Sequence, residues 1–449
     1  MVTVLISLAL GGAAETSGAP EFVTVSVQSA AGSSTVDHSI EARAVPLWLQ
    51  VSTESRTSQT IDADVVAGRA ASGIAALDGL SRLTPAELVA FVAANPTHID
   101  TILAAPPAAT AVTGWWQSLD DAARHELVAD VPQLVGNLDG VPLVQRGQAN
   151  ERYLRESVSS VTSLLADAQD RTSRSELNSE LSVLKQIEQA LLPPCAAPAR
   201  TLVLLDPADG GRAAIALGDP DTADFVSYLV PGMNYGVQEQ LVNWSNTAED
   251  LYYEQQTVLR ERAAATDTPL PSVATIAWIG YKTPSLFSVG GLDRAEVGAD
   301  FLEDSWKGIR SSRGDHQPYL SVFAHSYGTL VSLEALARGS VEVDALVVVG
   351  SPGSSVQSID RLDVADGNVF VGEADWDPAV NSGFFGSDPG TEAYGAHTLG
   401  VDGGTDAITG RALNKSWGHN DYFTPGSESL HNMALIGTRN SALAINASE

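Results

Sequence analysis

The chain has 449 residues, of which 44% are hydrophobic and 18% are charged, a composition typical of a folded protein and not of a disordered one. This length exceeds that of a usual single domain, so we expect a large core and a second folded region. Asp and Glu outnumber Lys and Arg by 55 to 25, and the formal net charge of −30 makes nucleic acid an unfavourable partner.

Residues 1–14 (MVTVLISLALGGAA) are apolar, but they lack the basic start of a signal peptide and are too short to span a bilayer. We expect a first strand or helix there. No later apolar run approaches the ~20 residues of a membrane helix. Cys195 is the only cysteine, so no intramolecular disulfide can form. The sequence predicts a chain without a membrane span. A cytoplasmic location is favoured over secretion without a recognisable signal peptide.

Residues 61–192 are rich in Ala, Leu, Glu, Gln and Arg, which predicts several successive helices. One helix start is marked by Thr84-Pro85-Ala86-Glu87, which provides a capping residue, a proline at the first helical position and an acid in the first turn. Residues 150–192 form one long helical stretch in this interpretation, because apolar residues recur there at helical spacing. The prolines at positions 193 and 194 end it.

After residue 200 short β-branched runs alternate with helix-like segments, and the runs are apolar on both faces. This alternation predicts parallel strands joined by crossover helices and covered by helices on both sides. The predicted strands span residues 201–205, 225–230, 273–279, 320–323, 346–349 and 369–371. We therefore expect a mostly α-helical region over residues 1–195 and an α/β domain with a mostly parallel sheet over residues 196–449.

The predicted strand 320–323 leads into Ala324-His325-Ser326-Tyr327-Gly328 and then into a helix-like segment. A strand that turns sharply at a serine into a helix is a nucleophile elbow, and it needs small residues two before and two after the serine. Ser326 is the only serine in the chain with Gly, Ala or Ser at the first of these positions and Gly at the second. We predict that Ser326 is a nucleophile.

A serine hydroxyl is a weak nucleophile at neutral pH, so it needs a base, and an acid must orient that base. In a mostly parallel sheet that carries a nucleophile elbow, these residues follow one another along the chain in the order serine, acid, histidine. The predicted strand 369–371 is followed by Gly372-Glu-Ala-Asp375-Trp-Asp377-Pro378, which places two aspartates just past a carboxyl end. We favour Asp377 as the acid because Pro378 stiffens its loop, and Asp375 is the alternative.

Three of the eight histidines, His397, His419 and His431, follow this acid. His419 lies in a loop-like stretch near the end of the domain, where this type of fold delivers its base, and we predict that it is the base. For His397 and His431 we favour a structural role at the surface or in the core. His325, next to the nucleophile, is expected to pack or to line the pocket.

A tetrahedral intermediate needs N–H donors, normally one from the residue after the nucleophile and one from a loop after an earlier strand. Tyr327 follows Ser326 and provides the first donor. The predicted strand 225–230 runs into Pro231-Gly232-Met233-Asn234-Tyr235-Gly236. Met233 is the predicted second donor, and Asn234 is the alternative.

Taken together, these motifs resemble an actinobacterial α/β hydrolase family long catalogued as a domain of unknown function. The resemblance covers roughly residues 115–423 of the chain. The matching pieces are Trp115-Trp116-x-x-Leu119, Val135-Gly-Asn-Leu-Asp-Gly-Val-Pro142, Arg146, Asn150, Pro231-Gly232, the Ser326 elbow, Ser351-Pro-Gly353, Asp377-Pro378 and Gly418-His419. The resemblance implies an α/β-hydrolase fold with a Ser, Asp, His triad but no settled substrate. This chain departs from the family pattern at Ala324, where Gly is commoner.

For residues 115–150 we favour a structural role over a binding role.

The sequence thus predicts a serine hydrolase that cleaves an ester or related acyl bond through an acyl-enzyme, on a small-molecule or lipid-like substrate. No His pair has metal-ligand spacing and no segment matches a phosphate loop, so neither a metal nor a cofactor is expected. A peptidase or amidase with the same triad is an alternative, as is a non-catalytic interaction module that binds a protein partner through its N-terminal helices. Residues 376–417 form a long loop that we expect to cover the site and shape specificity.

Overall fold

The structure is a computed structural model that describes residues 73–192, 198–285 and 288–444. The strand or helix expected at residues 1–14 lies outside the described residues, and so does Cys195. In the part of the chain that is described, no helix is long and apolar enough to cross a membrane.

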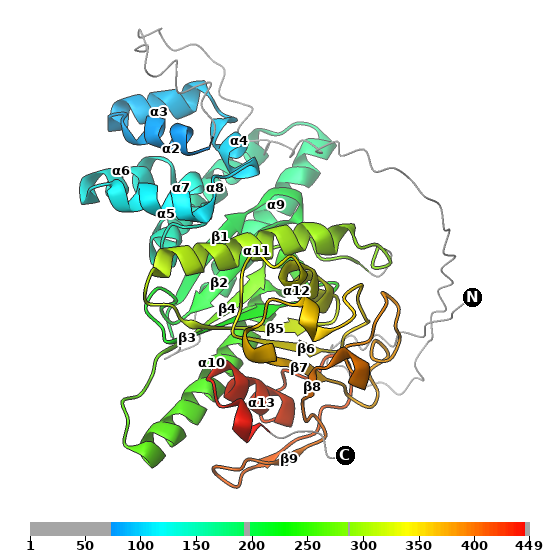
Figure 1. Ribbon diagram of the computed structural model, residues 1–449. Helices are drawn as coiled ribbons and strands as arrows, with labels where there is room; N and C mark the ends of the chain where they lie inside the picture. The colour runs from blue at the N-terminus through cyan, green and yellow to red at the C-terminus, as the bar shows by residue number, and fades with distance from the viewer. Residues whose placement is uncertain (1–72, 193–197, 286–287, 445–449) are drawn as a thin grey trace.

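Helices make up the first part of the described chain, and those before residue 138 lie at one end of the molecule (Figure 1). They are α2 (Ile74–Ser81), α3 (Pro85–Ala94), α4 (His98–Ala104), α5 (Ala109–Ser118), α6 (Asp121–Asp130), α7 (Pro132–Asn137), α8 (Leu143–Asp167) and α9 (Arg171–Ala190). The predicted start of α3 is confirmed, because Thr84 and Glu87 form a capping box in which the Thr84 amide donates to the Glu87 carboxylate at 2.9 Å. The helices α2 to α7 share a buried apolar cluster that includes Leu77, Phe91 and Trp115.

The prediction of one helical stretch over residues 150–192 is wrong in detail. The structure has two helices there, α8 and α9, and the first of them begins earlier, at Leu143. The carboxylate of Asp170 accepts a hydrogen bond from the Ser173 amide at 2.8 Å and so caps a new helix. A capping aspartate competes with the continuation of a helix, and the apolar periodicity alone does not reveal this break.

In the described residues, eight strands form one sheet in the order β1-β2-β4-β3-β5-β6-β7-β8. The strands are β1 (Arg200–Asp206), β2 (Arg212–Leu217), β3 (Phe225–Val230), β4 (Val273–Ile279), β5 (Tyr319–His325), β6 (Ala345–Val349), β7 (Val369–Gly372) and β8 (His397–Thr398). From β4 to β8 neighbouring strands are parallel, and β2 is antiparallel to both β1 and β4. The predicted mostly parallel sheet is confirmed, with β2 and the short β8 as additional strands that the prediction missed.

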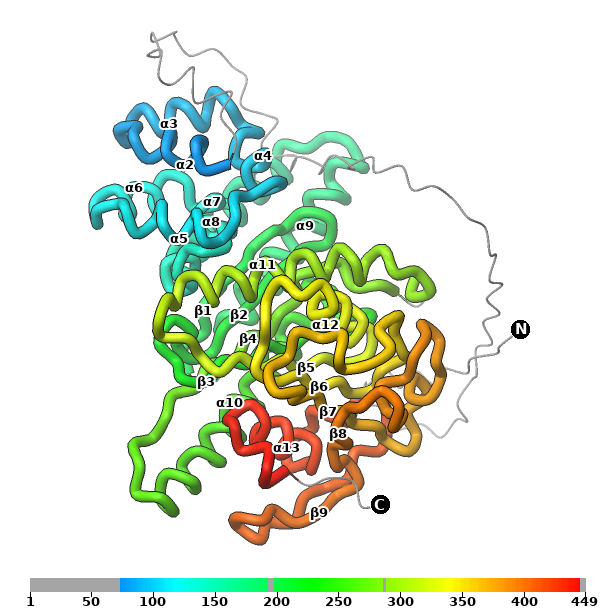
Figure 2. The backbone as a smooth tube through the Cα atoms, viewed as in Figure 1, coloured from blue at the N-terminus to red at the C-terminus, as the bar shows by residue number. Residues whose placement is uncertain are grey.

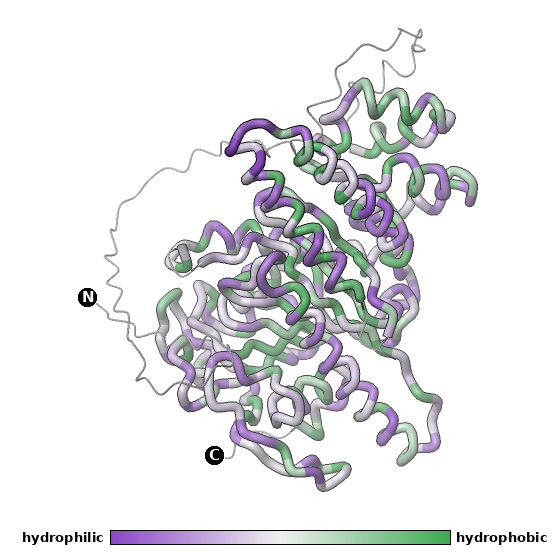
Figure 3. Tube along the Cα trace, turned by 180° about the vertical axis from the view of Figure 1, so that it is seen from behind, coloured by the Kyte–Doolittle hydropathy of each residue, from purple (hydrophilic) through white to green (hydrophobic). Residues whose placement is uncertain are grey.

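The two faces of the sheet are covered by different helices. One face packs against α8, α9, α10 (Val237–Thr266) and α13 (Glu428–Gly437), and the other against α11 (Asp293–Arg313) and α12 (Tyr327–Ala337). Figure 2 shows α10 and α13 near each other, with α10 packed on β4 and β2 and α13 on β5. Figure 3 shows hydrophobic residues concentrated along the central strands. Side chains alternate as in any strand, so Leu229 joins one core and Tyr228 and Val230 join the other.

Short elements complete the described chain. They are the 3₁₀ turns η2 (Ala208–Gly210), η3 (Ile359–Arg361), η4 (Ala365–Gly367), η5 (Glu392–Tyr394) and η6 (Ser441–Leu443) and the antiparallel pair β9 (Gly404–Thr405) and β10 (Ala412–Leu413). The predicted long loop of residues 376–417 therefore contains three short strands and one turn.

The helical end of the molecule rests directly on the first strand of the sheet. The Leu205 amide of β1 donates to the side chain of Asn137 at 2.8 Å. The Asn150 amide group in α8 donates both to the Gly136 carbonyl at 2.8 Å and to the Leu202 carbonyl of β1 at 3.0 Å. The division of the chain at residue 195 stays a prediction, and these bonds join the two predicted parts.

Candidate active site

Ser326 occupies the sharp corner between β5 and α12, as expected from its sequence context. Its backbone has φ 55° and ψ −127°, a conformation that a non-glycine residue adopts only when the surrounding structure enforces it. The Ser326 amide donates to the Val349 carbonyl of β6 at 3.0 Å. A Cβ on Gly328 would lie 2.5 Å from the carbonyl oxygens of both Val230 and Pro231. The predicted need for a small residue two after the serine therefore has a direct steric cause.

The structure brings together Ser326, His419 and Asp377, which come from three separate segments of the chain. Nε2 of His419 lies 2.7 Å from the Ser326 hydroxyl, and Nδ1 of His419 lies 2.8 Å from Oδ1 of Asp377. Because a carboxylate only accepts hydrogen bonds, Nδ1 carries the proton and Nε2 is free to accept from the serine. This geometry is the one that a general base next to a nucleophile requires.

Asp377 is buried and held by several donors. Its Oδ2 accepts from the hydroxyl of Tyr422 at 2.7 Å, and its Oδ1 also accepts from the Ala379 amide at 2.9 Å. Burial raises the pKa of Asp377. This effect is outweighed by the hydrogen bond and charge of His419 and by the hydrogen bonds from Tyr422 and Ala379, so the pKa of Asp377 lies below its usual value. Burial, with the nearby Asp377 charge, raises the pKa of Tyr422, which keeps its hydroxyl a donor.

Asp375, the alternative acid, is directed away from His419. Its carboxylate pairs with the ammonium group of Lys415 at 2.6 Å, and its side chain is 60% exposed. Lys415 also pairs with Asp402 at 2.6 Å. The structure therefore places Asp377 and not Asp375 against the histidine.

The segment after β3 lies directly against the serine. A Cβ on Gly232 would be 2.5 Å from Cβ and 3.0 Å from Oγ of Ser326, so only glycine fits there. The Asn234 amide donates to the Pro284 carbonyl at 2.9 Å, and this bond engages the amide of the alternative donor. Tyr327 is the first residue of α12, a position whose N–H has no carbonyl of its own helix to bond.

This segment and the turn are supported by Tyr281, which the sequence analysis did not select, and by the side chain of Tyr327. The Tyr281 hydroxyl donates to the Pro231 carbonyl at 2.7 Å, and the Tyr281 ring stacks on that of Tyr327 with the centroids 6.5 Å apart. Tyr327 in turn donates from its hydroxyl to the Gly291 carbonyl at 2.6 Å. Neither contact follows a short-range motif, so no local signal could have found them.

The long loop of residues 376–417 lies against the elbow. The Phe385 ring meets the Tyr327 ring edge-on with the centroids 5.8 Å apart, and the Phe385 amide donates to the Pro352 carbonyl at 3.2 Å. Trp376 and Trp417 stand next to the Asp377 and His419 segments and are 76% and 58% exposed. A large apolar side chain thus faces solvent directly before the acid in the chain, and another does so two residues before the histidine.

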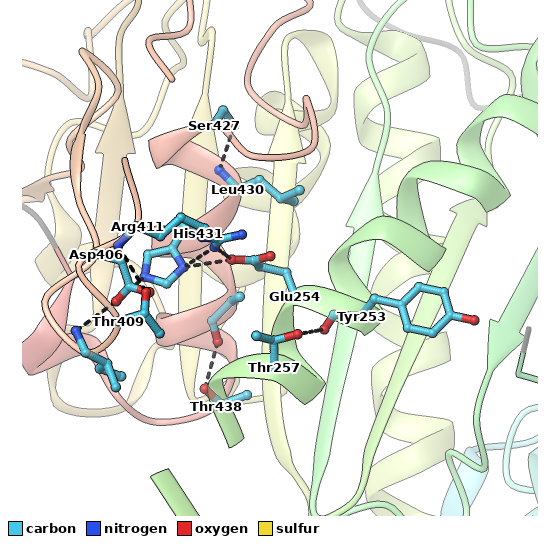
Figure 4. Close-up of polar contacts among 12 residues, drawn as sticks. Tyr253, Glu254, Thr257, Asp406, Thr409, Arg411, Ser427, Leu430, His431 and Thr438 are labelled. Atoms are coloured by element: carbon cyan, nitrogen blue, oxygen red, sulfur yellow. Dashed lines mark hydrogen bonds and ion pairs between the residues drawn. The ribbon is translucent and has the colours of Figure 1, made fainter. Parts of the chain in front are cut away.

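The remaining candidate histidines have structural surroundings, as predicted for them. His397 lies exposed in the short strand β8. His431 is buried in α13, with Nδ1 2.8 Å from the Glu254 carboxylate and Nε2 3.5 Å from that of Asp406 (Figure 4). Arg411 completes this cluster through a bond to Glu254. The cluster ties α10, α13 and the β9–β10 pair together.

The segment of residues 115–150 forms anchoring contacts. Trp115 and Trp116 are buried in the helical cluster. The Arg146 guanidinium donates to the Gly136 carbonyl at 3.0 Å and pairs with Asp139 at 2.5 Å. Among the residues that the structure describes, no group of three or more His, Cys, Asp or Glu side chains could hold a metal ion.

A family model described as alpha/beta hydrolase matches residues 206–386, a stretch that includes Ser326 and Asp377 and ends before His419. Uncharacterized protein Rv2079 of Mycobacterium tuberculosis is 28% identical over 388 residues, which cover 77% of this chain and 58% of that protein. Uncharacterized protein Rv0963c of the same organism is 32% identical over 200 residues, covering 43% of this chain and 74% of that protein. The chain thus spans 58% of the length of the first of these relatives. A solved esterase of the archaeon Pyrobaculum calidifontis is a remote structural neighbour, with a TM-score of 0.32, 14% identity and coverage of 63% of this chain and 97% of that one.

Proposed function

The chain belongs to the alpha/beta hydrolase family, and from this premise we propose that it is a serine hydrolase that cleaves an ester or a related acyl bond. The observation that carries the proposal is the unbroken hydrogen-bonded series from Ser326 through His419 to Asp377. A bare surface histidine or an isolated serine would not support it. The three side chains meet in the order and geometry of a nucleophile, a base and an orienting acid.

In the proposed reaction Oγ of Ser326 attacks the acyl carbonyl carbon while Nε2 of His419 takes the hydroxyl proton. The C–O bond to the leaving group then breaks, and His419 returns the proton to the departing oxygen. A water molecule repeats both steps on the acyl-enzyme and releases the acid. Asp377 keeps His419 in the required tautomer and stabilises the imidazolium that forms in each step.

The amides of Tyr327 and Met233 are the proposed donors to the oxyanion. The close approach of Gly232 to Ser326 supports this assignment, because it places the main chain of the next residue near the attacked carbonyl. The bond from the Asn234 amide to Pro284 favours Met233 over Asn234. We propose a small-molecule or lipid-like acyl group as the substrate, because apolar side chains border the site.

Labelling with a fluorophosphonate probe tests the activated serine. We expect the full chain to be labelled covalently, and we expect Ser326→Ala and His419→Ala to abolish labelling while circular dichroism shows an unchanged fold. His397→Ala is the matched control, because this histidine also follows the acid but lies exposed in β8. It should be labelled at the wild-type rate.

Two outcomes would contradict the proposal. A folded wild-type chain that stays unlabelled would favour a non-catalytic member of the family. Labelling that persists in Ser326→Ala would place the reactive residue elsewhere. A panel of p-nitrophenyl esters and anilides on the labelled protein then separates ester from amide cleavage, because both use the same type of intermediate.

A further inference from the structure

His325, the last residue of β5, makes a direct bond to the main chain of the proposed base. Its Nε2 lies 2.6 Å from the carbonyl oxygen of His419. A carbonyl oxygen only accepts, so Nε2 must carry the proton and Nδ1 must be the bare nitrogen. This Nδ1 is buried and has no hydrogen-bond partner. The residue as a whole is 2% exposed.

The ring of His325 also contacts several segments that build the site. It is tilted against the His419 ring, with the centroids 4.7 Å apart. Tyr235, from the segment that holds the proposed oxyanion donor, approaches it edge-on at 6.2 Å. Tyr422 and Phe423, which follow His419, lie at 6.2 Å on other sides. One side chain therefore links the nucleophile strand with the base, with the partner of the acid and with the oxyanion segment.

Electrostatics keep this ring neutral. Burial lowers the pKa of His325 to about 3, with the neighbouring His419 acting in the same direction. An imidazolium forms on His419 in the proposed reaction, and a second positive charge in the neighbouring, tilted ring would oppose that step. A neutral histidine therefore provides an N–H donor at this place without adding charge.

A purely structural role does not account for a histidine here. A buried nitrogen without a partner is unfavourable, and a phenylalanine of similar shape would fill the space without that cost. The feature that phenylalanine lacks is the Nε2–H bond to the His419 carbonyl. Because His325 and Ser326 are consecutive residues at the end of one strand, this bond fixes the position of the base relative to the nucleophile itself.

We propose that His325 is a positioning residue, which holds the main chain and ring of His419 so that Nε2 of His419 faces the Ser326 hydroxyl. The inference rests on the proposed function. It adds a required residue to the three of the triad, and it assigns to that residue one atom, Nε2, and one partner, the carbonyl of His419.

The test compares His325→Gln, His325→Asn and His325→Phe in the full chain. A glutamine amide nitrogen reaches about as far as Nε2 of histidine, whereas the shorter asparagine reaches only the position of Nδ1. We expect the second-order rate constant of fluorophosphonate labelling to fall about 10- to 100-fold in His325→Asn and His325→Phe, since a base misplaced by about 1 Å costs on this order. His325→Gln should stay within a few-fold of wild type.

His431→Gln is the control for replacing a buried histidine, since His431 is also 2% exposed but lies in the α13 cluster. It should lower the melting temperature and leave the labelling rate constant of the folded protein unchanged. The readout is a rate per folded molecule, so a loss of stability alone does not imitate the expected pattern. The asparagine and glutamine variants provide the comparison even where the phenylalanine variant does not fold.

Equal rates in His325→Gln and His325→Asn would overturn the inference, whether both are fast or both are slow, because the effect would then not depend on reach to the carbonyl. A wild-type chain that is not labelled at Ser326 would instead overturn the proposed function. The two failures are therefore distinguishable in one experiment.

Discussion

Nδ1 of His419 lies 2.8 Å from Oδ1 of Asp377, while Asp375, two residues earlier, pairs with Lys415 on the exposed side of the same loop. The side chain of Asp377 is completely buried and that of Asp375 is 60% exposed. Asp377→Asn should therefore lower kcat by about 10⁴-fold, because an amide at this place favours the wrong tautomer of the histidine. Steady-state hydrolysis of a p-nitrophenyl ester measures this.

Asp375→Asn is the matched control for that substitution. It removes a carboxylate of the same loop, and its expected effect on kcat is within about threefold because an exposed pair contributes little. The assignment of the acid would be reversed if Asp375→Asn were the inactive variant and Asp377→Asn retained activity.

Gly232 is expected to be irreplaceable for a steric reason. A Cβ there would lie 2.5 Å from Cβ of Ser326, so Gly232→Ala forces the segment that carries Met233 away from the serine. Loss of one oxyanion donor costs about 10²- to 10³-fold in kcat, and we expect a loss of this order. Ester hydrolysis and the melting temperature are measured together.

Gly418→Ala is the comparison for Gly232→Ala. Gly418 precedes His419, and a Cβ there meets no atom within 4 Å. This variant should keep nearly full activity. Wild-type activity in Gly232→Ala would mean that the segment is not part of the oxyanion site.

Residues in short-range motifs could be found from the sequence, and residues defined by distant packing could not. Ser326 stands in a strand–serine–helix context that a few neighbouring letters specify, and His419 and Asp377 follow from chain order and strand ends. The structure brings these three together. Other contacts depend on segments that meet only in the folded chain. They are those of Tyr281 with Pro231, of Tyr422 with Asp377 and of His325 with the His419 carbonyl.

The same distinction applies to the fold. Strands rich in β-branched residues, such as β4 (Val273–Ile279), were predicted with the bounds that the structure has. β2 reads RAAIAL, and its alanines lack the β-branched signal, although the strand is buried along nearly its whole length. Its antiparallel pairing with β1 and β4 is a tertiary property that local propensity does not encode.

A pH-dependent contribution to stability is expected from the cluster around His431. The cluster consists of Glu254, Asp406, Arg411 and His431. Burial raises the pKa of Glu254, but the hydrogen bonds of His431 and Arg411 and their charges outweigh it, so the pKa lies below its usual value. A carboxylate with a lowered pKa stabilises the fold above its unfolded pKa of about 4.3, and that stabilisation is lost as the pH falls through the folded value.

Arg411→Met should therefore lower the free energy of unfolding by about 1 kcal/mol at pH 7, a modest figure because the Arg411 side chain is 41% exposed. The difference from wild type should begin to shrink as the pH falls below about 4.3, where Glu254 of the unfolded chain becomes protonated, and should be lost once the pH falls below the lower pKa of the folded chain. Urea unfolding at several pH values measures this.

Arg152→Met removes a comparable partner from an exposed pair, since Arg152 and Glu156 are 45% and 52% exposed. Its cost should be smaller, at most about 0.5 kcal/mol. A difference between Arg411→Met and wild type that stays constant from pH 7 to pH 3 would show that packing of the arginine stem, and not the charge pair, is responsible.

The exposed aromatic side chains of the segment that carries Asp377 predict a preference for apolar acyl chains. In the described part of the chain the exposed large aromatic residues are Tyr253, Trp376, Phe384 and Trp417, and all but Tyr253 belong to the segment that carries Asp377 and leads to His419. An acyl chain that leaves water against these rings gains about 0.8 kcal/mol for each buried methylene group. Trp376→Ala and Trp417→Ala should therefore lower the ratio of kcat/KM for an octanoate ester to kcat/KM for an acetate ester by about 10-fold, equivalent to about 1.4 kcal/mol.

Tyr253 is an exposed aromatic residue of α10, and Tyr253→Ala should leave this ratio unchanged. An equal ratio in all three variants would mean that the substrate does not contact the tryptophans, and their exposure would then need a different partner.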